Sequence, residues 1–183
     1  MAEGIVVVEY DPAWPSSFRE VGERLRASLG DVALRIDHIG STAVEGLDAK
    51  PIVDIQVSVA SFEPLARYQG PIEQCGFVHR AGNTERTKRY FRERPGDRRT
   101  HIHVRRAGSF SEQFALLFRE FLRAHPDRAE EYAALKHELA ARYCLPHERQ
   151  LYVEAKVPFV WETIHLADDW AQAIGWEPPP TDA

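Results

Sequence analysis

A glycine–serine pair and a single aspartate are the residues whose types and spacing point most directly to phosphate chemistry. Gly40 and Ser41 end an apolar segment, and Asp54 lies further along the chain between apolar neighbours. Glycine lets the backbone approach a phosphate closely because it carries no Cβ, and Ser41 and Thr42 supply hydroxyls and backbone N–H donors. A carboxylate such as Asp54 can hold a divalent cation, and Lys50 can neutralise phosphate charge. We therefore predict Asp54 and Lys50 as catalytic residues, and Asp54 also as a metal ligand.

These residues also have ordinary structural interpretations. Residues 40–42 have the composition of a tight turn followed by a helix cap. Asp54 could be a solvated strand residue or a salt-bridge partner. Aspartate is disfavoured inside a strand unless an interaction compensates, and this favours a functional role for Asp54.

Two histidines alternate within a later segment, Arg99–Arg105, with apolar residues on the opposite face. Two imidazoles on one strand face suit a transition metal, a phosphate or base contact, or an ordinary hydrogen-bonded role. The histidine-triad phosphoesterase pattern needs a third alternating histidine, where this chain has arginine. The two-histidine phosphoesterases need a second His-x-Ser/Thr copy, which is missing. His101 and His103 are therefore predicted to bind ligand, with the metal alternative left open.

Strands in the first half and helices in the second must position these groups. Residues 52–59 alternate, so that Asp54 and Gln56 share one face of the clearest strand. Further strands are expected over 5–10 and 32–36, and around 77–81, 87–93 and 99–105. Helices are expected before Gly30, over 61–75 with a break near residues 70–71, over 110–122 and 126–143, and from 147 with a restart at Pro158. The apolar stripe of 110–122 predicts a core helix. This order predicts an α+β domain over residues 1–175, followed by an extended or frayed proline-rich tail, 176–183.

Composition narrows the possible partners and compartments. The net charge of -5 argues against an extended nucleic-acid surface but is compatible with a local basic pocket for a small anion. No apolar run is long enough to span a membrane, and the first residues lack the basic leader of a secretory signal. Cys75 and Cys144 are too few for a disulfide framework, so we expect a reduced, cytoplasmic protein.

Residues 38–55 resemble the signature of the GrpB family, and the similarity continues through 10–14, 101–104, 118–126, 132–136 and 152–159. The resemblance implies a nucleotidyltransferase-like fold, with a mixed β-sheet and a helical C-terminal half. In that superfamily the Gly-Ser pair contacts nucleotide phosphates, and the following strand carries Asp-x-Asp or Asp-x-Glu, which binds metal. Carried over here, Gly40 and Ser41 match the phosphate pair and Asp54 matches the first carboxylate, with Mg²⁺ or Mn²⁺ as the expected cofactor.

The chain departs from that pattern at Gln56, which occupies the second carboxylate position. A two-metal mechanism requires several carboxylates around cations about 4 Å apart, and glutamine is a neutral, weaker ligand. Two functions therefore stay open. One is the transfer of a nucleotidyl group from a nucleoside triphosphate to an acceptor. The other is binding of a nucleotide or phosphorylated metabolite without transfer, and fusions of family members to dephospho-coenzyme A kinase suggest a coenzyme A-related ligand by analogy.

The predicted ligand-binding set joins the loop, the strands and the last helices. Lys156 lies one helical turn from Tyr152, so both can face one ligand. Lys136 stays unassigned, because exposed helical lysines are common. The arginines of residues 89–99 could form a phosphate-facing wall or a solvated hairpin. The predicted ligand-binding residues are His38, Gly40, Ser41, Thr42, Gln56, His101, His103, Tyr152 and Lys156.

Overall fold

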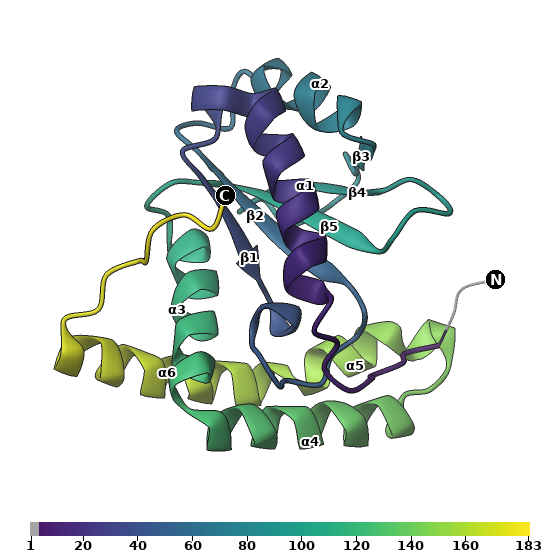
Figure 1. The fold of residues 1–183 in the computed structure, drawn as a ribbon. Helices are drawn as coiled ribbons and strands as arrows, with labels where there is room; N and C mark the ends of the chain where they lie inside the picture. Colours follow the sequence, from purple (N-terminus) through teal and green to yellow (C-terminus); the bar gives the residue numbers. More distant parts are fainter. Residues whose placement is uncertain (1–3) are drawn as a thin grey trace.

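The alternating segment forms strand β2, Val53–Val59, inside a five-stranded mixed sheet (Figure 1). This computed structural model describes residues 4–183, so the first three residues of the expected domain lie outside the described part. The sheet order is β1-β2-β5-β4-β3, and the β2–β5 pair is parallel while the other pairs are antiparallel. The other strands are β1 Arg35–Ile39, β3 Phe77–His79, β4 Arg89–Glu93 and β5 Thr100–Arg106.

One face of the sheet is apolar and supports the main core. Ile55, Val57, Ile102 and Val104 are fully buried on this face, because side chains two apart on a strand share a side. Helices α1, Trp14–Leu29, and α2, Ala66–Gln74, cover it. At roughly 2 kcal/mol for each buried aliphatic side chain, this face contributes a large share of the hydrophobic stabilisation.

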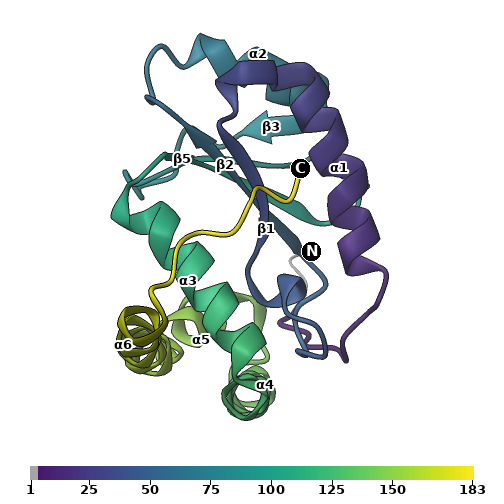
Figure 2. The same cartoon turned by 60° about the vertical axis from the view of Figure 1, so that its left-hand side comes forward.

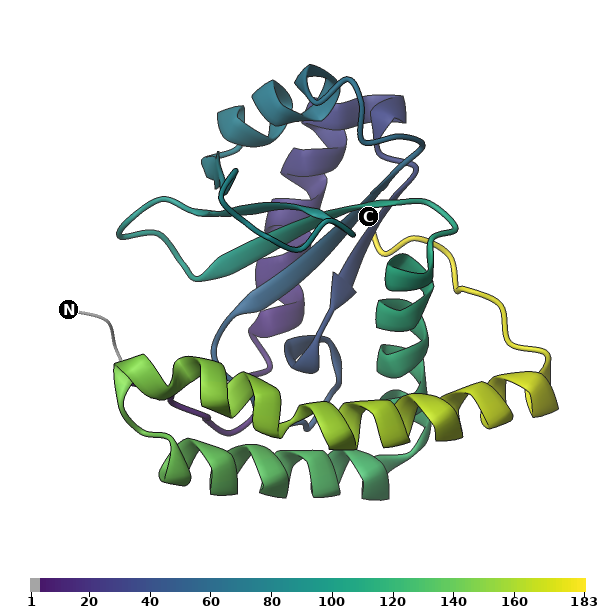
Figure 3. The ribbon, with the colours of Figure 1, turned by 180° about the vertical axis from the view of Figure 1, so that it is seen from behind.

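The opposite face carries the polar residues of the same strands. Helix α3, Phe110–Ala124, lies across its β1 end, on the side away from α1 (Figure 2). Helices α4 Pro126–Arg142, α5 Arg149–Ala155 and α6 Val157–Ile174 run along one end of the sheet (Figure 3). Single 3₁₀ turns occur at Gly30–Val32, Ser41–Ala43 and Pro146–Glu148. The prediction of an α+β fold with a helical C-terminal half is confirmed.

Several local predictions need correction. The segment 5–10 contributes only an isolated bridge from Val8 to Ala49. The next strand starts at Arg35 rather than at residue 32, because residues 30–32 form a 3₁₀ turn. Helix α2 continues through Pro71, since burial of Tyr68 and Ile72 on either side outweighs the one backbone hydrogen bond that proline removes.

The start of α3 differs from the expectation, and the tail makes a contact that the sequence did not predict. Phe110, expected in the core stripe, is 71% exposed because it is the first residue of α3, where its ring lies beside those of Phe114 and Trp161. The final residues of the tail lie along β1, where Asp182 accepts a hydrogen bond from the backbone N–H of His38. None of the helices within residues 4–183 combines the length and hydropathy needed to cross a bilayer.

Candidate functional site

The turn after β1 places a backbone directly against Asp54. Ile39 pairs with Asp54 in the β1–β2 ladder, so the chain passes this carboxylate as it leaves the strand. Gly40 adopts φ +72° at the start of the 3₁₀ turn, a conformation that favours glycine. A Cβ at Gly40 would lie 2.9 Å from Asp54 Oδ2. Glycine therefore meets both a backbone requirement and a space requirement here.

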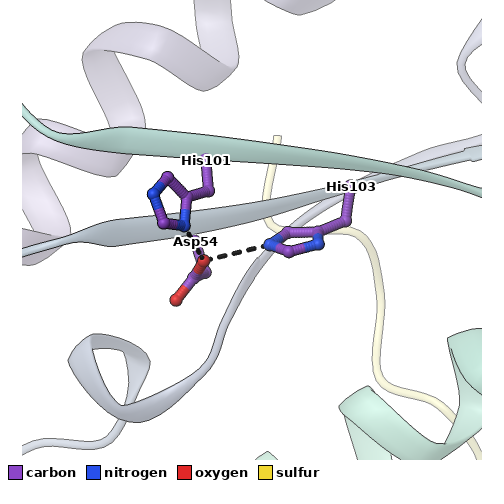
Figure 4. Close-up of side chains that lie close together, drawn as sticks. All are labelled: Asp54, His101 and His103. Atoms are coloured by element: carbon purple, nitrogen blue, oxygen red, sulfur yellow. Dashed lines mark hydrogen bonds and ion pairs between the residues drawn. The ribbon is translucent and has the colours of Figure 1, made fainter. Parts of the chain in front are cut away.

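Asp54 is held by the two histidines of β5 (Figure 4). His101 Nδ1 lies 3.2 Å and His103 Nε2 lies 3.0 Å from the same oxygen, Asp54 Oδ1. The parallel register explains this, because Asp54 pairs with His101 and Gln56 with His103. Burial favours a raised pKa for Asp54, but the hydrogen bonds from both imidazoles outweigh it and hold the pKa well below its usual range. Asp54 is therefore an anion with one oxygen, Oδ2, left beside Gly40.

These three residues offer one carboxylate and two imidazole donor atoms within 4.8 Å of one another, a spacing that could hold a metal ion. Burial lowers the pKa of His103 to about 4, so its ring is neutral and donates Nε2–H to Asp54. A metal bound between all three would move the ring hydrogens to His101 Nε2 and His103 Nδ1. Ligating histidines usually donate that hydrogen to an acceptor, and within residues 4–183 neither nitrogen has one. The geometry thus favours imidazoles that orient Asp54 through Oδ1 and leave Oδ2 free of them.

A small pocket of about 210 Å³ opens in front of Asp54 and is strongly basic. The ammonium groups of Lys50 and Lys156 lie 5.1 Å and 4.6 Å from the centroid of the Tyr152 ring. Lys136 lies 4.7 Å from the Tyr132 ring centroid and donates to the backbone oxygen of Asp48. The pocket is lined by Gly40, Ser41, Thr42, Ala49, Lys50, Ile52, Asp54, His101, Tyr132, Lys136, Tyr152 and Lys156.

Burial lowers the pKa of all three lysines, and neighbouring positive charges add to this effect. Burial lowers the pKa of Lys136 to about 7, and the nearby charge of Lys156 acts in the same direction. Burial and the charge of Lys50 lower the pKa of Lys156 to about 8, and burial with Arg149 lowers that of Lys50. Gathering three ammonium groups beside one carboxylate is unfavourable unless an anion shares the space. The pocket therefore concentrates positive charge around Asp54.

Tyr152 adds a hydrogen-bond donor to this pocket. Its side chain is fully buried, and its hydroxyl has no partner among the described residues. A buried, unpaired hydroxyl costs roughly 1–3 kcal/mol, a cost that a ligand oxygen would remove. Ser41 also lines the pocket, and its backbone begins the 3₁₀ turn, where N–H groups lack helical partners.

The pocket includes most but not all of the predicted residues. Gly40, Ser41, Lys50, Asp54, His101, Tyr152 and Lys156 line it together. Thr42 also lines it, but its hydroxyl contacts His38 Nε2 at 3.0 Å and the backbone oxygen of Ile52. His103 contacts Asp54 without lining the pocket.

Two predicted ligand-binding residues lie elsewhere in the structure. His38 is buried under the turn, stacked on Phe18 at 4.9 Å between ring centroids, and it positions Thr42. Gln56 is fully buried and accepts a hydrogen bond from Arg105 at 2.5 Å. Its amide also donates to the backbone oxygen of Glu112 at 3.4 Å, so the structure does not bring Gln56 to the pocket. Gln56 was expected beside the ligand because it shares a strand face with Asp54. Helix α3 covers that part of the face, so Gln56 does not reach the pocket.

Lys136 and Tyr132 line the pocket although neither was assigned to the site from the sequence. Both lie on α4 one turn apart, and both are buried. A lysine that shares a helix face with tyrosine and leucine residues is the signal that could have identified them, because a lysine placed on a buried face needs a partner.

The overall fold resembles that of nucleotidyltransferases. Two structures of Cid1, a poly(U) polymerase, superpose with TM-scores of 0.50 and 0.52, covering 70% and 74% of this chain and 42% and 43% of theirs. Their sequence identities are 10% and 15%, so this likeness shows the fold alone. The chain itself belongs to the GrpB family, whose model, described as GrpB protein, matches residues 4–165.

Nearer relatives agree with this assignment. The crystal structure of the conserved protein GrpB from Enterococcus faecalis has a TM-score of 0.79 and 33% identity, covering 88% of this chain and 96% of its own. A dephospho-CoA kinase of Mycobacterium tuberculosis is 34% identical over 197 residues, covering 94% of this chain and 48% of its own length. The chain spans about half the length of the first curated relatives that it matches.

Proposed function

We propose that the basic pocket binds the phosphate chain of a nucleoside triphosphate and that the protein transfers the nucleotidyl group to an acceptor hydroxyl. The observation that carries this proposal is the convergence of the Gly40 backbone, anionic Asp54 and three lysines on one pocket of about 210 Å³. In the reaction, the acceptor oxygen bonds to the α-phosphorus while the bond to the bridging oxygen breaks. Pyrophosphate leaves, and the acceptor proton passes to solvent.

The donor set of this pocket fits Mg²⁺ or Mn²⁺. Mg²⁺ in proteins is commonly held by one or two carboxylates together with substrate phosphates, and Asp54 supplies the carboxylate. When bound, the cation would neutralise charge on the phosphate oxygens. His101 and His103 keep Asp54 ionised and fix its orientation through Oδ1. The free oxygen, Oδ2, lies on the Gly40 side.

The remaining groups bind and position the phosphates. Lys50, Lys136 and Lys156 offset the charge of the triphosphate from partly or fully buried positions, where electrostatic interactions are stronger than in bulk water. Ser41 and Tyr152 supply hydrogen-bond donors on two sides of the pocket. Lys136 and Tyr152 are held on helices α4 and α5, and Lys156 directly follows α5, so these groups are positioned before the substrate binds.

A second candidate function is binding without transfer, and the state of Gln56 favours it. The second carboxylate position holds a neutral amide that is engaged by Arg105 at 2.5 Å. A positive charge at this place disfavours a second cation. On this alternative the ligand is a nucleotide or a phosphorylated metabolite. The relatives named dephospho-CoA kinase make a coenzyme A-related compound the first to test.

The deciding experiment measures both binding and transfer. The protein is incubated with α-labelled nucleoside triphosphates and Mg²⁺ or Mn²⁺, and labelled products and pyrophosphate are followed, while calorimetry gives the affinity. Transfer that falls at least about a hundredfold in Asp54→Asn, but not in the exposed Glu45→Gln, supports the enzyme. Nucleotide binding with no product in either protein supports the alternative. Absence of binding by every nucleotide and by dephospho-coenzyme A contradicts both.

A further inference from the structure

A second, larger cavity of about 450 Å³ adjoins the phosphate pocket. Lys50 and Ile52 line both cavities, so the two cavities are neighbours with these two residues between them. The second cavity extends over β4 and the loop that joins β4 to β5, and Arg149 at the start of α5 closes one side of it.

The charge of this second cavity is opposite to that of the chain as a whole. Its lining carries six cationic side chains against two carboxylates, in a protein with net charge -5. Within residues 4–183, neither Arg80 nor Arg149 lies within ion-pair distance of a carboxylate. Such a local concentration of unpaired arginine on an acidic protein attracts small anions. Guanidinium groups match phosphate oxygens in pairs, which makes arginine the typical residue for this task.

Two of the arginines are held in place by a single buried carboxylate. Glu93 Oε1 accepts from Arg92 at 2.9 Å and from Arg99 at 3.1 Å, and the glutamate is only 8% exposed. Arg92 Nε is buried and has no partner among the described residues. Arg92 also pairs with His101 in the β4–β5 register, and His101 contacts Asp54. Arg92, which lines the second cavity, is thus the cross-strand neighbour of His101, which lines the phosphate pocket.

We propose that this arginine cavity binds the phosphate group of the second substrate, a small phosphorylated acceptor, while the triphosphate occupies the pocket at Asp54. This inference rests on the proposed function, since it names the acceptor of that reaction. A small molecule is favoured over a polymer because the chain carries a net charge of -5, whereas polymer binding draws on an extended basic surface.

The test uses inorganic phosphate as the probe, titrated into the full chain saturated with Mg²⁺ and a non-hydrolysable triphosphate. Arg80→Ala combined with Arg94→Ala removes two exposed side chains from the cavity wall. Arg19→Ala, an exposed arginine on α1, is the matched control. We expect saturable phosphate binding that weakens at least about tenfold in the double variant and less than about twofold in the control. Equal phosphate affinity in wild type and double variant overturns the inference.

Two further measurements distinguish a failure of this inference from a failure of the proposed function. Phosphate that competes with the triphosphate for one site contradicts a second substrate site, whereas simultaneous binding supports it. A single-stranded RNA that displaces phosphate at lower concentration than ribose 5-phosphate does overturns the choice of a small acceptor. If the wild type fails to bind any nucleotide, the proposed function fails. The arginine cavity is then tested by phosphate binding that persists in Lys156→Ala and weakens in the double variant.

Discussion

The two faces of the sheet have different roles, since one supports the main core and the other carries the candidate site. On one face, Ile55, Ile102 and Phe91 are fully buried beneath α1 and α2 and belong to the main apolar core. On the other face, Asp54 and His101 come from the same two paired strands, β2 and β5, yet they line a basic pocket. The difference shows how a rigid apolar layer fixes the spacing of polar groups on the opposite face. Without that support, holding these like-charged and partly buried groups together would be unfavourable.

This comparison separates effects on stability from effects on binding. A change on the apolar face should unfold the protein without altering the affinity of the molecules that stay folded. A change on the polar face should alter affinity and leave most of the stability in place. The following predictions test that separation, beginning with the largest effect.

Ile55→Ala tests the apolar face. Removing a fully buried aliphatic side chain leaves a cavity, and we expect the free energy of unfolding to fall by about 3 kcal/mol. Ser58→Ala is the control from the polar face of the same strand. Ser58 is also fully buried, but its hydroxyl has no partner among residues 4–183, so its loss should cost less than about 1 kcal/mol. Denaturant unfolding measures both, and a large loss of triphosphate affinity in folded Ile55→Ala would break the comparison.

Gly40→Ala tests the contact between the turn and Asp54. The new Cβ would lie 2.9 Å from Asp54 Oδ2 at a backbone φ of +72°, and we expect a loss of about 2 kcal/mol in stability together with loss of triphosphate binding. Gly46→Ala is matched, since Gly46 has φ +76° and nothing within 4 Å of its added Cβ. It should show the backbone cost while binding is retained. Equal binding by the two variants would show that Asp54 and the turn do not act together.

The pH dependence of binding tests the lysines. The pKa values of Lys136 and Lys156 are about 7 and about 8, and a bound phosphate favours their charged forms. Affinity is therefore greatest below these values and falls as pH rises through them, by about tenfold or more between about pH 7 and pH 9.5. Lys156→Arg keeps its charge over this range and should flatten the curve. An unchanged pH profile in that variant would remove Lys156 from phosphate binding.

The last prediction concerns His38, whose titration affects stability rather than binding. Burial lowers the pKa of His38 from 6.5 to about 4, so the unfolded chain takes up a proton where the folded protein does not. The free energy of unfolding should therefore decrease as pH falls from 6.5 toward 4, by up to about 1.4 kcal/mol per pH unit for this one group. His38→Gln should reduce that slope in denaturant unfolding measured at several pH values. A slope equal to that of the wild type would show that His38 is not the group responsible.

Much of the fold could be predicted from local patterns. Alternation identified β2, and the three-to-four-residue spacing of apolar side chains identified α1 and α3, because each pattern reflects one buried face. The course of α2 through Pro71 was missed, since the burial that sustains it depends on contacts distant in sequence. The contacts of Asp182 with the backbone of β1 and with the buried side chain of Arg119 were missed for the same reason.

The candidate site shows the same limit. Gly40, Ser41 and Asp54 are joined by one hairpin-like connection, and their association could be predicted from sequence. Lys136 reaches the pocket from α4, so only the packing of that helix reveals it. Gln56 was misplaced because strand alternation indicates the face on which a side chain lies, whereas the cover provided by α3 and Arg105 decides whether it meets the ligand.

A crystal structure of the protein with Mg²⁺ and a non-hydrolysable nucleoside triphosphate tests the central claim most directly. The account predicts phosphate oxygens within hydrogen-bond distance of Ser41, Tyr152 and Lys156, with the cation on Asp54 Oδ2. A triphosphate bound on another face of the sheet, with the pocket at Asp54 filled only by water, would contradict it.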